Sequence, residues 1–129
     1  MIAVGCGSAV NLENSRGQLE FGIQAARMDL WREAQFRFQR ALDLDPNSVM
    51  ALNNLAVAYE GIGEFEKAKE AYRRALQVDR GNEYVQRNYS RFMEFYSRYD
   101  EEKKEDEPNG EEPKDEPSKD GEDSKGGFQ

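Results

Sequence analysis

The sequence has no histidine and only one cysteine, Cys6, among its 129 residues. Without imidazole, the chain lacks the commonest general base and the commonest metal ligand of proteins. A single cysteine can form neither an internal disulfide nor a thiolate cage around a metal. These absences favour a non-catalytic protein that holds no cofactor and no metal. Aspartate, glutamate, lysine and serine are still available to an enzyme, so an enzyme stays the weaker alternative.

The sequence also has no run of 18 apolar residues, so no α-helix of it is expected to span a membrane. Its charge is distributed unevenly along the chain. Residues 100–129 carry thirteen Asp or Glu against five Lys, a net charge of −8, whereas residues 1–99 hold thirteen acids and thirteen bases. No stripe of basic residues is present, and we therefore predict no nucleic-acid partner.

The acidic segment 100–129 contains three of the four prolines and no aliphatic residue. It cannot bury enough apolar surface to offset the roughly 1–2 kcal/mol per residue that ordering a backbone costs. The composition therefore predicts a disordered acidic tail, which by default is a solvated segment.

Two stretches of the sequence echo each other 34 positions apart: FQRALDLDPN at 38–47 and YRRALQVDRG at 72–81. Four pairs are identical at this offset: Arg40/Arg74, Ala41/Ala75, Leu42/Leu76 and Asp45/Asp79. The period extends further, because Phe21 maps to Leu55 and Tyr89, and Gly22 maps to Ala56 and Ser90. The sequence therefore predicts a helical hairpin that is written twice and begun a third time.

Apolar spacing by three and four residues predicts five helices between about residue 17 and residue 98. The first runs from about Gly17 to Arg27 or Met28, with Asp29 as the N-cap of the second, which Pro46 stops. We expect Asn47 or Ser48 to cap the third helix, and Gly61 and Gly63 to end it. The fourth and fifth helices are predicted over 64–78 and 83–98.

This pattern resembles the tetratricopeptide repeat, a 34-residue helix–turn–helix unit. The stretch GIGEFEKAKEAYRRAL (61–76) is a particularly close match, and the pairs Phe21–Gly22 and Leu55–Ala56 supply the large and small residues of the pattern. Gln18, Leu52 and Arg80 depart from it, and we expect these departures to weaken local packing. The resemblance implies an all-α fold in a short right-handed superhelix. Its parts would be a flexible leader (1–15), a repeat domain (16–99) made of repeat 1 (15–48), repeat 2 (49–82) and a capping helix (83–98), and the tail (100–129).

The resemblance further implies a concave groove, lined by the first, third and fifth helices, that binds a segment of a protein partner. The same register gives the candidate peptide-binding residues: Leu19, Ile23, Met50, Asn53, Asn54, Val57, Tyr84, Arg87 and Arg91. For Leu19, Ile23 and Val57, packing between neighbouring helices is an equally good interpretation. Binding of chaperone C-termini is not supported, because only Asn54 matches the residues with which some members of the family clamp a carboxylate.

The fifth predicted helix is unusually aromatic, and its stripe of Val85, Tyr89, Phe92 and Tyr96 should cover the fourth helix. Phe95 and Tyr99 lie partly off this stripe. We favour a capping helix that completes the core. The alternative is a homodimer, or a scaffold fragment of a longer array, that self-associates through the remaining ring surface.

The leader contains Ala3-Val4-Gly5-Cys6, which resembles a bacterial lipobox, the motif in which a cysteine is lipidated. A working signal needs a basic segment and an apolar run upstream, and only Met1 and Ile2 precede the motif. Two interpretations stay open. Either the written start is internal and the protein is a lipoprotein of the bacterial cell envelope, anchored through Cys6, or the leader is a short flexible start of a cytoplasmic protein.

Taken together, the residues and the resemblance predict a non-catalytic protein–protein interaction module that acts as an adaptor. The alternative from another class is a small enzyme or regulatory domain that works through paired carboxylates. Only the abundance of acids supports it, and Glu64, Glu66 and Glu70 have the spacing of a solvated helix surface.

Overall fold

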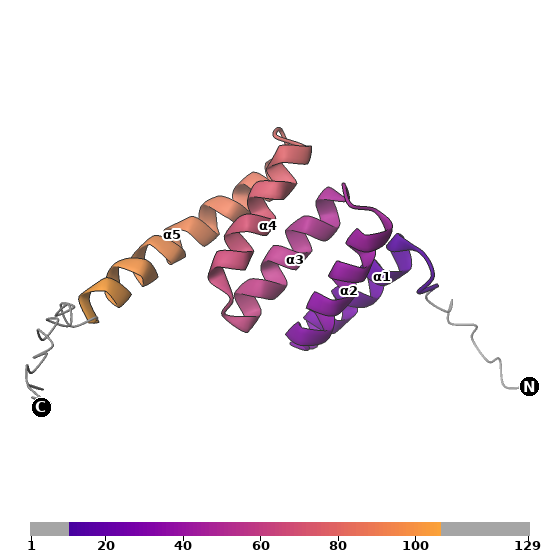
Figure 1. Ribbon diagram of the computed structural model, residues 1–129, viewed down its shortest axis with the longest axis horizontal. Helices are drawn as coiled ribbons and strands as arrows, with labels where there is room; N and C mark the ends of the chain where they lie inside the picture. Colours follow the sequence, from indigo (N-terminus) through magenta and orange to yellow (C-terminus); the bar gives the residue numbers. More distant parts are fainter. Residues whose placement is uncertain (1–10, 107–129) are drawn as a thin grey trace, which may run out of the picture.

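The computed structural model describes residues 11–106, and within this range it contains five α-helices and no strand (Figure 1). The helices are α1 (Ser15–Arg27), α2 (Trp31–Leu44), α3 (Val49–Ile62), α4 (Phe65–Val78) and α5 (Glu83–Asp106). The predicted all-α class is therefore confirmed. The first helix begins two residues earlier than the apolar spacing indicated.

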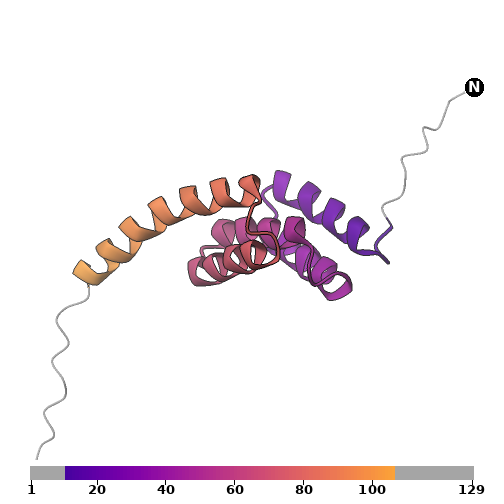
Figure 2. The same cartoon turned by 90° about the horizontal axis from the view of Figure 1, so that it is seen from above.

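The helices form two antiparallel hairpins, α1 with α2 and α3 with α4, that stand side by side, and α5 runs along α4 at the end of the row (Figure 1). Seen from above, α5 continues well past the body formed by the other helices (Figure 2). Helices α1, α3 and α5 are the first members of successive units, as the 34-residue period requires.

Each of these three helices begins at a capping residue that recurs at the 34-residue spacing. Asn14, Ser48 and Asn82 accept hydrogen bonds through their side-chain oxygens from the backbone N–H groups of Gly17, Ala51 and Val85, at 2.7, 3.2 and 3.2 Å. Such caps satisfy donors that the first turn of a helix leaves without partners. Ser48 was one of the two caps predicted for the third helix. The recurrence at Asn14 and Asn82 adds a polar position to the repeat.

The turn inside each hairpin is built on a residue in the left-handed backbone region. In the second hairpin this residue is Gly63, with φ of 85°, which confirms the predicted helix stop. In the first hairpin the equivalent residue is Asp29, with φ of 58°. The prediction that Asp29 caps α2 is therefore wrong, and Leu30 holds that position without a side-chain hydrogen bond. Aspartate suits both roles because its short polar side chain also tolerates the left-handed region.

The core is built where a ring from the second helix of a hairpin meets a small residue of the first. A Cβ added at Gly22 would lie 2.5 Å from Cε1 of Phe38, so the close crossing of α1 and α2 requires glycine there. Phe38 and its equivalent Tyr72 are both fully enclosed, with 1% and 0% of their surface exposed. Gly61 lies inside α3, where the ring of Trp31 covers it, so the prediction that it ends the helix is wrong.

Helix α5 packs on α4 through the predicted aromatic stripe. The ring of Tyr72 lies 5.6 Å from that of Tyr89 and 5.7 Å from that of Phe92, centroid to centroid. The helix ends at Asp106 rather than near residue 98. Two contacts account for the extension: the ring of Tyr99 packs edge-on against Phe65 at 4.9 Å, and Lys104 Nζ lies 2.6 Å from Asp100 Oδ2, one turn away.

The opposite end of the row is closed by a polar contact at Gln18. This side chain is 5% exposed, its Nε2 donates to the carbonyl of Leu12 at 2.6 Å, and its Oε1 accepts from Arg37 Nη1 at 3.3 Å. The carbonyl of Asn11 lies directly over Gly17, where a Cβ would clash with it. Gln18 therefore replaces the large apolar residue of the repeat pattern with a bonded polar cover, instead of leaving the site loosely packed.

The predicted disordered tail (100–129) is wrong for residues 100–106, which form the end of α5. Three predictions fall outside the described residues: the flexible leader as far as residue 10, the lipidation of Cys6, and the disorder of the tail from residue 107 on.

A candidate peptide-binding groove

A hollow of about 580 Å³ lies across α1, α3 and α5, the helices predicted to line a binding face. Five of the nine candidate residues line it: Ile23, Met50, Asn53, Asn54 and Tyr84. Met50 and Tyr84 present much of their apolar surface to solvent there, with 59% and 61% exposed. The hollow therefore offers apolar walls next to side-chain amides, the combination that suits an extended peptide.

A second, smaller hollow of about 220 Å³ continues from the first toward Trp31 and Phe38. Ile23, Arg27 and Asn54 line both hollows, and Val57 lines the smaller one. We call the two together the groove. It is continuous over α1 and α3, and α5 closes one of its ends through Tyr84.

The floor of the groove holds an amide whose hydrogen-bonding capacity is incompletely used. Asn53 is 1% exposed, and its Oδ1 accepts from Nδ2 of Asn88 at 3.1 Å. Its own Nδ2 is buried and has no hydrogen-bond partner among the described residues. Leaving a buried donor unbonded costs about 1–3 kcal/mol of stability.

The remaining candidates lie elsewhere. Leu19 is partly buried and packs against the core, as the alternative interpretation of this residue stated. Arg87 and Arg91 are exposed on α5 and line neither hollow. These two arginines therefore lie outside the lining of the groove.

Sequence reasoning missed several residues of the groove. Arg27, Val49, Asn82 and Val85 also line the larger hollow, and Asn88 orients Asn53. The 34-residue repeat of caps could have pointed to Asn82. Nothing in the local sequence pairs Asn53 with Asn88, because 35 residues separate them and only the packing of α5 brings them together.

Among residues 11–106, no carboxylate lines the groove, and cations are present beside it. None of the described residues that line either hollow is Asp or Glu, whereas Arg27 lines both. Within residues 11–106, Arg27, Arg87 and Arg91 form no ion pair. This side of the molecule therefore favours a negatively charged ligand over a positive one.

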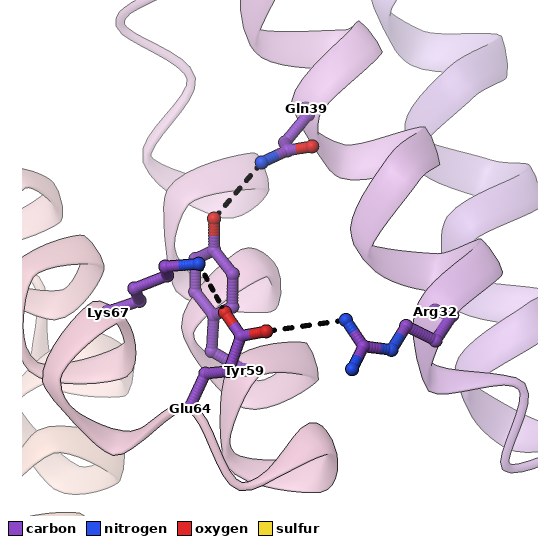
Figure 3. A network of polar contacts seen from close by, with 5 residues as sticks. All are labelled: Arg32, Gln39, Tyr59, Glu64 and Lys67. Carbon is purple, nitrogen blue, oxygen red and sulfur yellow. Dashed lines mark hydrogen bonds and ion pairs between the residues drawn. The ribbon is translucent and has the colours of Figure 1, made fainter.

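The ionisable groups with shifted pKa values lie away from the lining of the groove. Glu64, at the start of α4, contacts Lys67 at 2.6 Å and Arg32 at 3.3 Å, and Lys67 is the larger cause of its lowered pKa (Figure 3). The same network includes Tyr59, whose hydroxyl accepts from Gln39 Nε2 at 3.0 Å (Figure 3). These contacts tie α2 to the second hairpin and have a structural role.

Two tyrosines carry raised pKa values for the same kind of reason. Burial raises the pKa of Tyr72, and its hydroxyl also donates to Glu60 Oε1 at 2.5 Å. The hydrogen bond that Tyr96 donates to Glu66 raises its pKa to about 12. The shift of Tyr72 reports its burial and its contact with Glu60 of α3, whereas the shift of Tyr96 reports the contact of α5 with α4.

Three carboxylates, those of Glu64, Glu66 and Asp100, help to line a hollow of about 360 Å³ between the start of α4 and the end of α5. Each of the three is engaged, Glu64 by Lys67, Glu66 by Tyr96 and Asp100 by Lys104. Over residues 11–106 no cluster of three His, Cys, Asp or Glu side chains is arranged to hold a metal ion. No helix in the same range is long and apolar enough to cross a membrane.

Comparison with known proteins agrees with this architecture. The family model of the tetratricopeptide repeat matches residues 49–82, the predicted second repeat. The chain is 32% identical over 83 residues to the type IV pilus assembly protein PilF of Pseudomonas aeruginosa, a match that covers 64% of this chain and 33% of the relative. It is 38% identical over 50 residues to the uncharacterised protein ycf37 of Pyropia yezoensis, which covers 39% of this chain and 28% of that protein.

A solved structure is similar over a longer stretch. The crystal structure of MamA superposes with a TM-score of 0.62 and 23% identity, and covers 73% of this chain and 55% of that one. At this identity the likeness shows the fold alone. The chain spans about a third or less of the length of the two curated relatives, so their whole-protein roles do not carry over directly.

Proposed function

The chain contains a tetratricopeptide repeat, and on that premise we propose that its groove binds an extended segment of a protein partner. The repeat and the hairpin fold are those of a protein–protein interaction module. The observation that carries the proposal is the hollow that unites Met50, Tyr84 and the buried, partly unbonded Asn53. On this proposal the chain works as an adaptor without catalysis.

The chemistry of the hollow indicates how the segment is held. Met50 and Tyr84 would cover an apolar side chain of the ligand, each such burial contributing about 1.5–3 kcal/mol. Asn54 would bond backbone carbonyls, which every peptide offers at regular intervals, above the buried amide of Asn53. Backbone bonding gives affinity, and the apolar hollow selects among side chains.

The relative from Pseudomonas aeruginosa is described as a type IV pilus assembly protein. Its similarity to this chain favours a partner within a larger assembly for this chain too.

A peptide selected from a random display library against the full chain would test this function. We expect Met50→Ser combined with Tyr84→Ser to weaken binding of that peptide at least about tenfold, the equivalent of about 1.4 kcal/mol. Phe36→Ser is the matched control, because Phe36 is half exposed on α2 and lines neither hollow. Equal affinities of the double variant and the wild-type chain would exclude the groove as the binding site.

We further propose, as a second arrangement, that the ring surface left exposed at the end of α5 supports self-association. Phe95 and Tyr99 are 43% and 38% exposed although they also pack on Phe65. Sedimentation at high concentration should then give a dimer that Phe95→Ser reduces, and a monomer at every concentration would remove the proposal.

Lipid anchoring through Cys6 also stays a prediction. Mass spectrometry of the protein purified from membranes of its native cell would give the mass of a lipidated cysteine, and an unmodified Cys6 would contradict the anchor.

A further inference from the structure

Helix α5 carries a row of arginines that form no ion pair among residues 11–106. Its middle member, Arg91, lies near the Tyr72 hydroxyl, which donates to Glu60. Arg87, Arg91 and Arg98 are spaced by four and seven residues, which puts them on one face of the helix. None of them joins an ion pair within the described range 11–106, and Arg98 donates only to the backbone carbonyl of Glu94, at 3.3 Å. Glu94 is the single acid between Tyr84 and Arg98, so this stretch has a net charge of +2.

Along α5 the chemistry changes in a fixed order. Tyr84 stands at the apolar hollow with Ile23 and Met50, the arginine row follows, and the last eight residues 99–106 carry five acids against two lysines. The distance from Asp106 back to Tyr84 is about 33 Å at 1.5 Å per helical residue. A ligand that lay along this path would need negative charge in its middle and an apolar group at the Tyr84 end.

The segment that follows α5 in the sequence has this order of chemistry. Residues 107–129 carry eight acids against three lysines, and their single aliphatic or aromatic residue, Phe128, comes after all of the acids. Twenty-three residues can span about 76 Å when extended, more than twice the 33 Å to be covered. If the segment turned back beside α5, its acids would pass the arginines before Phe128 reached the hollow.

We propose that residues 107–129 occupy the groove of their own chain, with the acids along Arg98, Arg91 and Arg87 and Phe128 between Met50 and Tyr84. The inference rests on the proposed function, since it assigns an internal competitor to the same groove. Covalent attachment favours this occupant over a free acidic peptide, because a short flexible tether gives an effective concentration of about a millimolar.

The contacts would be mainly electrostatic, and this sets how the occupant responds to conditions. The Debye length falls from about 10 Å at 0.1 M to about 3 Å at 1 M salt, so exposed acid–arginine attraction weakens strongly over that range. A partner that brings a better apolar anchor would displace the segment. High salt weakens the internal competitor and so frees the groove. The affinity of the chain for such a partner should therefore fall less with added salt than it would if the partner were attracted to the groove by charge alone.

A spin-label experiment on the full chain tests the inference without any partner. A nitroxide is attached to Ser124→Cys in a Cys6→Ser background, and amide resonances are recorded. We expect Met50, Asn53 and Tyr84 to lose most of their intensity near 0.1 M salt and to recover near 1 M. Resonances of Arg73 and Gln77, on the exposed surface of α4, should stay sharp throughout. Uniform broadening, or none, would overturn the proposal.

Two sets of variants separate its parts. The amide resonances of the spin-labelled chain should recover in Phe128→Ser, and also in the triple variant Asp120→Lys, Glu122→Lys and Asp123→Lys. The control variant Ser118→Ala should leave them broadened. Arg87→Glu with Arg91→Glu should also restore them. Broadening that survives both the tail and the arginine changes would overturn the assigned contacts.

The proposal also requires docking within one chain. A chain that carries the nitroxide at natural isotope abundance is mixed with an isotope-enriched chain that carries no nitroxide. The amide resonances of the enriched chain should stay sharp. Broadening in this mixture would mean exchange between copies and would overturn the intramolecular proposal.

Failure here is distinguishable from failure of the proposed function. With the peptide selected above, Phe128→Ser should raise affinity about two- to tenfold, as expected when a competitor at millimolar effective concentration is removed. If the label reports no docking while Met50→Ser with Tyr84→Ser still abolishes peptide binding, the groove function stands and the internal competitor does not.

Discussion

The two hairpins share one backbone plan and reach it with different side chains. The first pairs Gly22 with Phe38 and turns at Asp29, whereas the second pairs Ala56 with Tyr72 and turns at Gly63. The difference shows that the period constrains size and backbone angle more tightly than residue identity. It also shows where the first hairpin is compromised, because a non-glycine residue occupies its left-handed position. The family model matches residues 49–82, which contain the second hairpin.

The strongest way to break the comparison is to remove the central ring from each hairpin. Phe38→Ala and Tyr72→Ala should each lower the free energy of unfolding by about 3–5 kcal/mol, because both rings are fully enclosed. Urea unfolding followed by circular dichroism measures this. A small effect at one position alone would mean that the two rings are not equivalent.

Adding a methyl group should affect the two crossings differently. Gly22→Ala should cost about 1–3 kcal/mol of unfolding free energy, because its Cβ would lie 2.5 Å from the ring of Phe38. The second hairpin already carries alanine at the equivalent position, Ala56. Combining Gly22→Ala with Phe38→Leu should recover part of the loss, and no recovery in urea unfolding would contradict the steric cause.

The hydroxyl of Tyr72 distinguishes the second hairpin chemically. Tyr72→Phe removes the bond to Glu60 and should cost about 1 kcal/mol near neutral pH. Because burial raises the pKa of Tyr72 in the folded state, its stabilisation is fully present below the unfolded value of about 10 and is lost as the pH rises further. Thermal unfolding as a function of pH should therefore show a drop above about pH 10 that is smaller in Tyr72→Phe. An unchanged drop would point to Tyr96, whose pKa of about 12 gives the same sign.

The smallest expected effects are at the turns. Asp29→Gly should raise the free energy of unfolding by about 0.5–1 kcal/mol, since glycine adopts a positive φ without the penalty of a Cβ. The reciprocal change Gly63→Asp should lower it by a similar amount. Differential scanning calorimetry resolves both, and opposite signs from the two variants would sharpen the contrast between the hairpins.

The sequence was sufficient to predict the period, the all-helical class and most of the core, because burial of alanine and aromatic residues at fixed spacing leaves few other packings. It misassigned Asp29 because aspartate favours both caps and left-handed turns. It ended α5 too early because residues 99–106 have the composition of the acidic segment that follows. The contact of Tyr99 with Phe65 can be read only from the structure, whereas the pair Asp100–Lys104, four residues apart, could have been read from helical spacing.

The groove was predictable in part for a similar reason. Helical register brought Ile23, Met50 and Tyr84 to one face, and these residues do line one hollow. Register gave no indication that the Asn53 amide pairs with Asn88, which lies on a helix of the next unit. Pairing of polar groups across units depends on superhelical geometry, which spacing within one helix does not encode.

The bonded cover at Gln18 has a consequence for assembly. Another hairpin could stack onto the outer side of α1 only if residues 11–14 moved away, which would leave the Gln18 amide without its hydrogen bond to the Leu12 carbonyl. This hydrogen bond therefore opposes head-to-tail polymerisation at that end of the row, because any filament would first have to displace residues 11–14.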